Sequence, residues 1–468
     1  MACGRMRRAA WAWGLPVAVL GFGCTTDLRA PKQLHDQGRF EAAAEAVVQV
    51  RAEPQDTLWV RLEQGKILQD AGRFEESNRA FEEAYAIRES LDDSAVISTT
   101  GAINNALIFV TDDRALDYEG TVVDRILMRL GVVVNHLLLG QIDLAAVVAR
   151  SLDREQQQVR EELEADSANR RRAIEEGAKS KGLVVDANSI ESNATYRQAQ
   201  SDLDAIASSS RNAMAVPGAG FPAWVAFMAD RSPDQAEGAL TWLAEGPIPA
   251  SLVQALQRRT SAGSLGEDVY VYFEQGLAPE RIDGSIGFAV APGVRIPKVA
   301  LPKLRSRSLA TPARLSIEAG PELLATEVIG SVEAAIAGEF RDRLIFIWGR
   351  PVLIAAFKIG LTVAAAASVE DDNARGLILV GGAIWNTLTM PDLRTWTTLP
   401  ATQQAAVVPR PSSGRLQVGL GNASPTKREV VLPPGPVFLY ARSTGAGALS
   451  VRVVALDQRR AAVSEVNP

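Results

Sequence analysis

The chain has 468 residues, a net charge of −6 from 49 basic and 55 acidic residues, and a hydrophobic content of 47%. A chain of this length normally forms two or three domains with sizeable cores. The mild acidity excludes a general electrostatic attraction to nucleic acid, and the lack of low-complexity tails predicts a folded protein rather than a disordered one.

The N-terminus has the order of charges that is typical of an export signal. Arg5, Arg7 and Arg8 precede an uncharged, mostly apolar run from Ala9 to Gly23. A spanning helix needs about 20 apolar residues, and this run is shorter and is interrupted by Pro16. The pattern therefore predicts a signal peptide over residues 1–23, with an uncleaved anchor as an alternative.

The residues at the end of the apolar run resemble a bacterial lipobox, "LGFGC", which ends at Cys24. The leucine lies four residues before the cysteine instead of three, and Phe22 stands where a small residue is usual. Cys3 leaves with the signal, so Cys24 has no partner for an intramolecular disulfide. We expect lipidation (palmitate) at Cys24, with ordinary signal cleavage as the alternative. Thr25 in place of aspartate favours the periplasmic face of the outer membrane.

A repeat of 34 residues follows the signal. "DQGRFEAAAEAV" begins at Asp36 and "DAGRFEESNRAF" begins at Asp70, and 34 residues is the period of a tetratricopeptide repeat. The pattern predicts helical hairpins with turns at Gly38 and Gly72. A further turn is expected at Gly140, two periods later.

The pattern of residue types changes near residue 260. Short runs rich in β-branched and aromatic residues, such as "DVYVYFEQG" and "ARLSIEAG", predict strands, and helical patterns and further strands follow them. The predicted fold class is α+β: a tether at 24–30, a tetratricopeptide-like helical repeat domain at 31–260 and a mixed α+β domain at 261–468. A charged helix after Leu152 is expected to project into solvent.

The segment from Pro351 to Val369 is nearly all apolar, which raises the alternative of a membrane helix. Lys358 lies at its centre, and alanine makes up much of the rest. We therefore expect a helix buried against a sheet, with the Gly381-Gly382 pair allowing close packing next to it.

Three motifs carry a resemblance to a known group of proteins. They are "LDYEGTVVDRILMRLGVVVNHLLLGQIDLAAVVAR", "VYVYFEQGLAPERI" and "MPDLRTWTTLP", which follow the repeat helices in this order. The chain resembles an uncharacterised family of bacterial envelope lipoproteins with tetratricopeptide-like repeats. The resemblance implies a role in cell-envelope assembly, with the cell-wall synthesis machinery among the candidate partners. It carries over no catalytic residue, and the proline-rich "VVPRPSSGR" is a departure from the family pattern.

The sequence offers little catalytic chemistry. Only His35 and His136 are available as imidazole bases, and both fall in predicted helices. No zinc-ligand spacing, phosphate loop or dinucleotide fingerprint is present, so no metal site and no cofactor are predicted. The chain is expected not to be an enzyme.

Paired carboxylates remain the one catalytic scheme that spacing cannot exclude, because the two partners can come from distant positions. The candidates are Asp112, Asp113, Asp117 and Glu119. Tyr118 and Glu119 are also candidate ligand contacts, although a position at a helix start gives Glu119 a structural role with the helix dipole.

Arg394 and Trp396 lie two apart in an extended motif and therefore share one face. We expect Trp396 to pack against the helices, and Arg394 to bind carbonyls or pair with a carboxylate.

The predicted working surface is the concave face of the helical repeats, which the first helix of each repeat lines. In the second repeat this helix offers Trp59, Arg61, Gln64 and Leu68 as partner-binding residues. The expected function is a non-catalytic adaptor or scaffold that binds envelope proteins. A wall-acting enzyme that uses carboxylates and a carrier of an apolar ligand remain alternatives, as does a purely structural role for the repeats, with Trp59 packed on Phe40.

Overall fold

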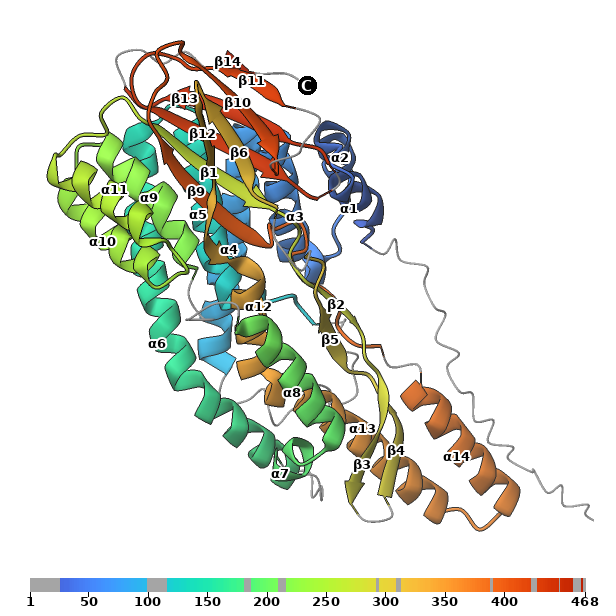
Figure 1. Cartoon of the computed structure of the whole chain (residues 1–468). Helices are drawn as coiled ribbons and strands as arrows, with labels where there is room; N and C mark the ends of the chain where they lie inside the picture. Colours follow the sequence, from blue (N-terminus) through green and yellow to red (C-terminus); the bar gives the residue numbers. More distant parts are fainter. Residues whose placement is uncertain are drawn as a thin grey trace, which may run out of the picture.

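The computed structural model has a mixed α+β fold (Figure 1). It describes residues 26–98, 116–180, 187–208, 216–291, 294–308, 313–387, 390–421, 427–445, 447–457 and 464–465. The predicted signal peptide, Cys24, Asp112 and Asp113 lie outside the described residues.

Two helical hairpins open the described chain. Helices α1 (Arg29–Asp36) and α2 (Phe40–Val47) form the first, and a short 3-10 turn η1 (Pro54–Asp56) leads to α3 (Thr57–Asp70) and α4 (Phe74–Ser98). The φ angles of Gly38 and Gly72 are 73° and 87°, a region that glycine enters without steric cost. The predicted glycine turns are therefore confirmed. Helix α1 begins at Arg29, within the predicted tether.

Helices α5 (Val122–Leu138) and α6 (Ile142–Ser180) form a third hairpin, whose turn contains Gly140 with a φ of 70°. Thr121 caps α5 and forms a reciprocal capping box with Asp124. The end of α6 does not project freely as expected, because Ile174 and Ala178 are buried in a cluster with residues of α13.

Further helices follow α6 in the chain. Helix α9 is buried over nearly its whole length, which explains why its sequence is apolar on every side. The elements are α7 (Ala187–Glu191), α8 (Ala194–Ala207), η5 (Pro217–Ala219), α9 (Gly220–Ala229), α10 (Pro233–Ala244) and α11 (Ala250–Ser261).

A six-stranded sheet covers these helices, with the strand order β14-β13-β12-β1-β9-β8. Strand β1 is central: it pairs in parallel with β12 and antiparallel with β9. The strands are β1 (Val269–Gln275), β8 (Glu327–Ser331), β9 (Thr402–Val408), β12 (Val437–Ser443), β13 (Ser450–Ala455) and β14 (Ser464–Glu465). Strands β12 and β13, which are adjacent in the chain, pair antiparallel.

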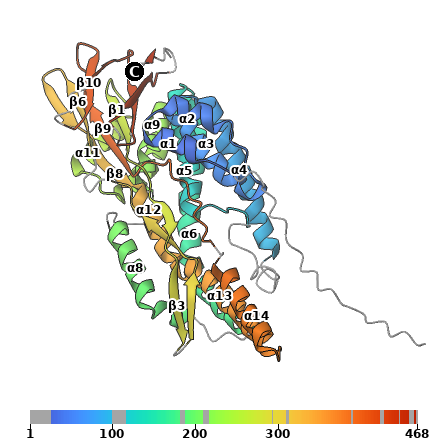
Figure 2. The same ribbon diagram turned by 90° about the vertical axis from the view of Figure 1, so that its right-hand side faces the viewer.

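A four-stranded sheet, β11-β10-β6-β7, packs on the other face of the six-stranded sheet. Figure 2 shows the sheets and helices α1–α5 as separate layers. Alternate β1 residues divide between these layers: Val271 contributes to the core between the sheets, and Tyr272 to the core under the helices. The strands are β6 (Leu315–Ala319), β7 (Glu322–Ala325), β10 (Arg415–Leu420) and β11 (Arg428–Val431).

The other end of the molecule contains two strand pairs and three helices. The pairs are β2 (Glu280–Asp283) with β5 (Pro302–Arg305) and β3 (Ile286–Ala291) with β4 (Val294–Val299). The helices are α12 (Val332–Asp342), α13 (Leu344–Ala367) and α14 (Asp372–Thr387).

Helix α13 is long and apolar enough to cross a membrane, with a mean hydropathy of 1.7, but 56% of that window is buried inside the protein. It packs mainly against α6, α7 and α14 and touches β4, so the expected burial against a sheet is largely burial against helices. Gly382 lies where a side chain would collide with Thr362, so the predicted close packing is confirmed for this glycine, whereas a side chain at Gly381 would meet open space.

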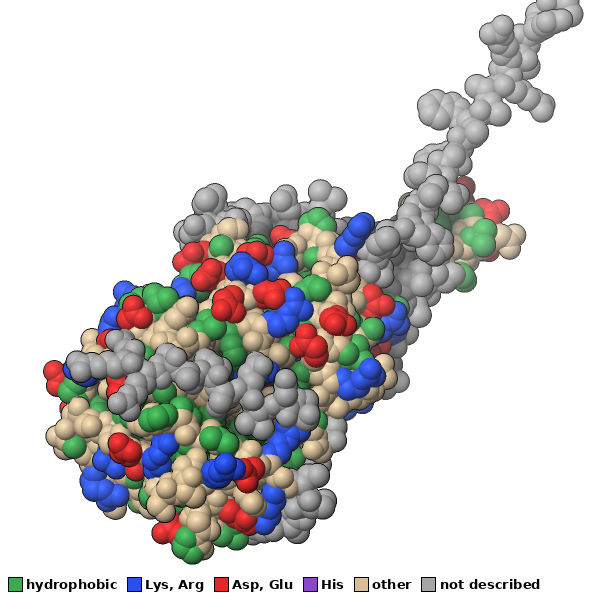
Figure 3. Space-filling model, turned by 90° about the horizontal axis from the view of Figure 1, so that it is seen from above, with side chains coloured by type: hydrophobic (Ala, Val, Ile, Leu, Met, Phe, Trp, Pro, Cys, Tyr) green, Lys and Arg blue, Asp and Glu red, His purple; other side chains and the backbone are tan. Residues whose placement is uncertain are grey.

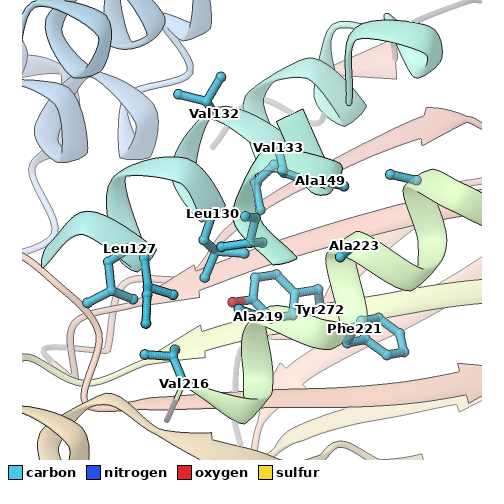
Figure 4. Packing of buried hydrophobic residues seen from close by; sticks show 14 of the residues in the cluster. Leu127, Leu130, Val132, Val133, Ala149, Val216, Ala219, Phe221, Ala223 and Tyr272 are labelled. Carbon is cyan, nitrogen blue, oxygen red and sulfur yellow. The ribbon is translucent and has the colours of Figure 1, made fainter. Parts of the chain in front are cut away.

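The largest hydrophobic cluster crosses the domain boundary predicted at residue 260. It contains Leu130 of α5, Phe221 of α9 and Tyr272 of β1, and Figure 4 shows these three side chains close together. The rings of Phe221 and Tyr272 are stacked with their centroids 6.3 Å apart. The division into two domains stays a prediction, but the helices and the six-stranded sheet share a core.

Candidate functional site

The described chain begins two residues after Cys24 and is already held to the body there. The Thr26 hydroxyl accepts a hydrogen bond from the backbone N–H of Glu53 (3.0 Å), and Leu28 is buried among residues of α2 and α3. Only Thr25 separates Cys24 from Thr26 in the sequence, so a group attached to Cys24 is joined to the folded body by a very short connection.

The face of α3 that was predicted to bind a partner contacts this chain's own residues 390–400. The Trp59 indole N–H donates to the carbonyl of Thr395 (3.0 Å), and Lys32 lies over the indole ring. Leu68 is buried in the small cluster under α1 and α2. Trp59 and Leu68 thus have intramolecular contacts, and the prediction that they bind a partner remains a prediction.

Arg61 and Gln64 lie at the half-exposed edge of the same helix. Arg61 donates to the Gln64 side-chain oxygen (2.6 Å) and pairs with Glu83 of α4 (2.7 Å). Of the four predicted residues, these two present polar groups toward solvent.

Glu63 fixes the 390–400 segment to α3. Its buried carboxylate accepts hydrogen bonds from the backbone N–H and the hydroxyl of both Thr397 and Thr398, at 2.6 to 3.2 Å. Burial opposes the negative charge, but Lys32 and these hydrogen bonds outweigh it, so the pKa of Glu63 lies below its usual value. The carboxylate therefore binds two successive residues of the extended segment.

Arg394 and Trp396 have the structural roles expected from the sequence. Arg394 donates to the carbonyls of Gln55 and Leu116 and pairs with the carboxylates of Asp56 and Asp392. Trp396 is buried, with its ring 5.7 Å from that of Phe81 on α4. Arg394 thus joins three distant segments of the chain.

A buried ionic cluster lies between α3 and the central strands of the six-stranded sheet. Lys66 binds Asp70 (2.7 Å) and Glu274 (2.5 Å), and Arg442 donates to the other oxygen of Asp70 (3.0 Å). The Tyr440 hydroxyl donates to Glu274 (2.8 Å). Two cations and two carboxylates balance in charge, and the members come from α3, β1 and β12.

Asp70 is the carboxylate with the most partners in this cluster. Burial alone would raise its pKa, but the charges of Lys66 and Arg442 and a hydrogen bond from His35 (2.8 Å) hold the pKa well below its usual range. His35 is buried and joins α1 to the cluster, and His136 contacts Gln141 (2.7 Å). Both histidines therefore have structural partners. For His136, which is half-buried on α5, this agrees with the expectation of a packed helix residue.

A cleft of about 210 Å³ borders the 390–400 segment at Asp392, Arg394 and Thr395. Its walls come from the loop before α5, from α12 and the first half of α13, from β2 and β5, and from the residues around Arg394. The charged residues among the lining are Asp117, Glu119, Glu339, Asp392, Arg281, Arg343, Arg350 and Arg394. Cations and carboxylates are equal in number, so the cleft is polar but not strongly charged.

The N-terminus of α5 supports one wall of this cleft. Both Glu339 oxygens accept backbone N–H groups, from Val122 and Val123 (3.0 Å each), and Asp124 accepts the N–H of Thr121 (2.8 Å). These carboxylates satisfy free N–H groups at the positive end of the helix. Glu119, which was expected in this role, is exposed instead.

Asp124 is a buried carboxylate near the cleft whose pKa is raised above its usual value. Burial raises its pKa to about 6, and the negative charge of Glu339 acts in the same direction, against the hydrogen bonds from Thr121. Burial also raises the pKa of Tyr118 well above its usual value, and its hydroxyl donates to Asp124 (3.4 Å). Tyr118 thus has a structural partner, and Asp117 and Glu119 lie exposed at the rim.

The described residues contain no group of three or more side chains suited to hold a metal ion. The face seen in Figure 3 carries Lys, Arg, Asp and Glu side chains intermixed, without a large area of one sign. Neither observation favours a metal site or a nucleic-acid surface in the parts of the chain that the structure describes.

Sequence reasoning missed Glu274, Arg442 and Glu339. A signal did exist for the first two: both are charged residues within strands that are otherwise rich in aromatic and aliphatic residues, and their register makes them neighbours on β1 and β12. For Asp124, the spacing from Thr121 is that of a capping box, with aspartate in place of the usual glutamate. No local signal marks Glu339, because its partners lie more than 200 residues away in the chain.

We predict that Asp124→Asn makes stability less dependent on pH. The folded pKa of Asp124, about 6, is above its ordinary value of 3.8, so the stability it contributes is complete below pH 3.8 and is lost as the pH rises through 6. The free energy of unfolding of the variant minus that of wild type should therefore rise by up to about 3 kcal/mol from pH 4 to pH 7. Urea unfolding followed by tryptophan fluorescence measures this difference.

Asp117→Asn, which removes an exposed carboxylate from the loop before α5, is the matched control for the loss of one carboxylate. A difference between Asp124→Asn and wild type that stays constant over this pH range would show that Asp124 does not titrate as described.

Comparison with protein-family models, curated proteins and solved structures found no match for this chain. The resemblance to envelope lipoproteins therefore rests on the three sequence motifs. Function has to be argued from the sequence of the N-terminus and from the geometry of the folded body.

Proposed function

We propose that this protein is a lipid-anchored, periplasm-facing adaptor or scaffold of the outer membrane, with a non-catalytic role in cell-envelope assembly. Cys24 is the proposed lipidation site, and α1–α6 are proposed to stack as tetratricopeptide-like pairs. The partners would be envelope proteins, with the cell-wall synthesis machinery as the class that the sequence resemblance suggests.

The observation that carries this proposal is the short connection between Cys24 and the folded body. Two residues extend at most about 7 Å, and Thr26 and Leu28 are already bound to the first helices. Acyl chains on Cys24 would therefore hold α1 and its neighbours next to the membrane surface. A protein held in this way presents a fixed set of surfaces to the periplasm, which suits an adaptor.

The polar side chains of the candidate sites support a role by contact rather than by chemistry. The carboxylates of Glu63 and Asp70 each bind several groups of their own chain. His35 is bonded to Asp70 and is fully buried. Such groups stabilise the fold and are not accessible to a substrate.

One observation favours the alternative of a carboxylate enzyme. Asp124, whose pKa is raised, lies near Glu339, and Glu339 lines a cleft. A raised pKa in a cleft is typical of a general acid. However, both oxygens of Glu339 and one of Asp124 bind N–H groups of α5 and its cap, and Asp124 does not line the cleft. The geometry therefore supports capping of a helix better than catalysis.

The alternative of an apolar carrier has less support. Pockets for small molecules are usually about 300–1,000 Å³ and mostly apolar, whereas the cleft beside Arg394 is about 210 Å³ and is lined by eight charged residues. A larger pocket of about 650 Å³, between the α1–α2 turn and β13, also has charged residues in its lining: Arg39, Glu41, Asp70, Arg428 and Arg452.

We predict that Cys24→Ser gives a folded protein that no longer partitions with membranes. Two or more acyl chains anchor a protein firmly, and the change removes their attachment atom. Fractionation of cells followed by immunoblotting measures the distribution, and circular dichroism of the purified variant checks its fold. Cys3→Ser is the matched control and should leave the protein in the membrane fraction. Recovery of Cys24→Ser there at wild-type levels would contradict the proposed anchor.

We also predict that the pair of changes Arg61→Glu and Gln64→Arg removes a specific envelope protein from crosslinked pull-downs. Both residues lie at the half-exposed edge of α3, so the changes should alter recognition with little effect on stability. A matched control is Arg415→Glu, at the exposed pair with Glu429 on the four-stranded sheet. An unchanged set of captured proteins, with the melting temperature preserved, would exclude this edge as the main contact.

A further inference from the structure

The second half of α13 and the whole of α14 form a helical hairpin with an apolar surface. Figure 1 shows α14 beside α13, at the end of the molecule away from the six-stranded sheet. Leu377 is 74% exposed, the largest exposed fraction of any large hydrophobic residue in the described chain. The other exposed members of this surface are Leu361, Val363, Leu379 and Val380.

The exposed residues of α14 are not confined to one face. Successive helical residues are separated by about 100°, so Leu377 and Val380 lie about 60° apart on one face, and Leu379 lies on nearly the opposite side. The close contact between Gly382 and Thr362 marks the side that packs on α13. A helix that is apolar on every side is normally buried, so the sides of α14 that face neither α13 nor β4 lack a covering surface.

The charges of the hairpin disfavour the interior of a lipid bilayer as that cover. Glu370, Asp371 and Asp372 occupy the tip between the two helices and are exposed. A tip that enters a membrane first would carry these carboxylates into hydrocarbon, at a cost of several kcal/mol. A protein surface with cations suits this tip better.

This chain carries such cations at the base of the same hairpin. Arg350 of α13 and Arg281 line the cleft described above. The cleft contains as many carboxylates as arginines, but Glu339 pairs with Arg343 and Asp392 pairs with Arg394. Arg281 is half-buried, lies over the ring of Phe340, and makes no ion pair within the described residues. It is thus a cation that can receive a carboxylate from outside.

The tip and the cleft lie at opposite ends of the hairpin. From Arg350 to Ala367, α13 rises about 26 Å. Two hairpins packed antiparallel about a two-fold axis would therefore place each acidic tip at the arginine-containing cleft of the other copy, which is the reciprocal arrangement of a symmetric dimer.

The area of the hairpin face alone is smaller than a stable interface needs. Two helices about 24 Å long and about 10 Å wide present a face of roughly 480 Å², whereas a stable interface buries about 800 Å² on each partner. The apolar face alone is too small, and the contact between tip and cleft adds area at both of its ends.

We propose that a second copy of this chain covers the α13–α14 hairpin. The two hairpins pack antiparallel through Leu377 and Val380, and the carboxylates at residues 370–372 of each copy bind at the cleft that contains Arg281 of the other.

The first test is the mass of the full chain in mild detergent, measured by sedimentation equilibrium. Wild type should be a dimer, and Leu377→Asp should weaken the dimer at least tenfold. Leu323→Asp is the matched control, because Leu323 is 59% exposed but lies on β7 of the four-stranded sheet. It should leave the dimer unchanged.

The second test uses exchange of charges. Glu370→Lys combined with Asp372→Lys should weaken the dimer, and so should Arg281→Glu in a separate protein. Mixing these two proteins should restore dimers as tight as wild type within a factor of three, because in the mixed pair both contacts join opposite charges. Asp371 is kept because it caps α14.

A monomeric wild type, a dimer that Leu377→Asp does not weaken, or a mixture that dimerises no better than its components would overturn the proposal. A monomer of Cys24→Ser that binds phosphatidylglycerol vesicles through Leu377 would instead identify a membrane as the cover and would also overturn it.

Discussion

The buried ionic cluster around Asp70 is the interaction on which the arrangement of helices and sheet depends. Removing charges from water costs several kcal/mol per ion, so the cluster is stable only while every member keeps its partners. These partners come from α1, α3, β1 and β12: His35, Lys66 with Asp70, Glu274, and Tyr440 with Arg442. A shift of α3 relative to the strands would leave an uncompensated buried charge, so the cluster fixes their relative position.

The same helix holds the extended segment before β9, through Glu63 and Trp59. The face of α3 that the sequence pattern assigned to an external partner is thus largely covered by residues 390–400 of the same chain. Among the described surfaces that remain open to other molecules are the polar edge of α3 and the apolar α13–α14 hairpin. The proposed adaptor role and the proposed dimer use these two separate surfaces, so either one can fail without the other.

Local features were predictable from the sequence, and long-range pairs were not. Gly38 and Gly72 could be placed in turns because a 34-residue repeat and a positive φ angle have local causes. The capping role of Arg394 was anticipated from its motif, but Asp56, one of its carboxylate partners, lies 338 residues away. Neither the approach of Glu274 to Lys66 nor the burial of α6 against α13 has a local signature, because both depend on how distant elements pack. The exposed apolar surface of α14 was likewise unforeseen, since an apolar helix predicts burial.

The central claim is that the N-terminal helices and the six-stranded sheet form one cooperative unit joined at Asp70. The most direct measurement is native-state hydrogen exchange in low denaturant, on wild type and on Asp70→Asn. In wild type, the slowest amides of α3, β1 and β12 should share one free energy of opening, and Asp70→Asn should lower it for all three by about 3 kcal/mol. The account would be contradicted if the helices opened independently of the strands in wild type, or if the variant affected α3 alone.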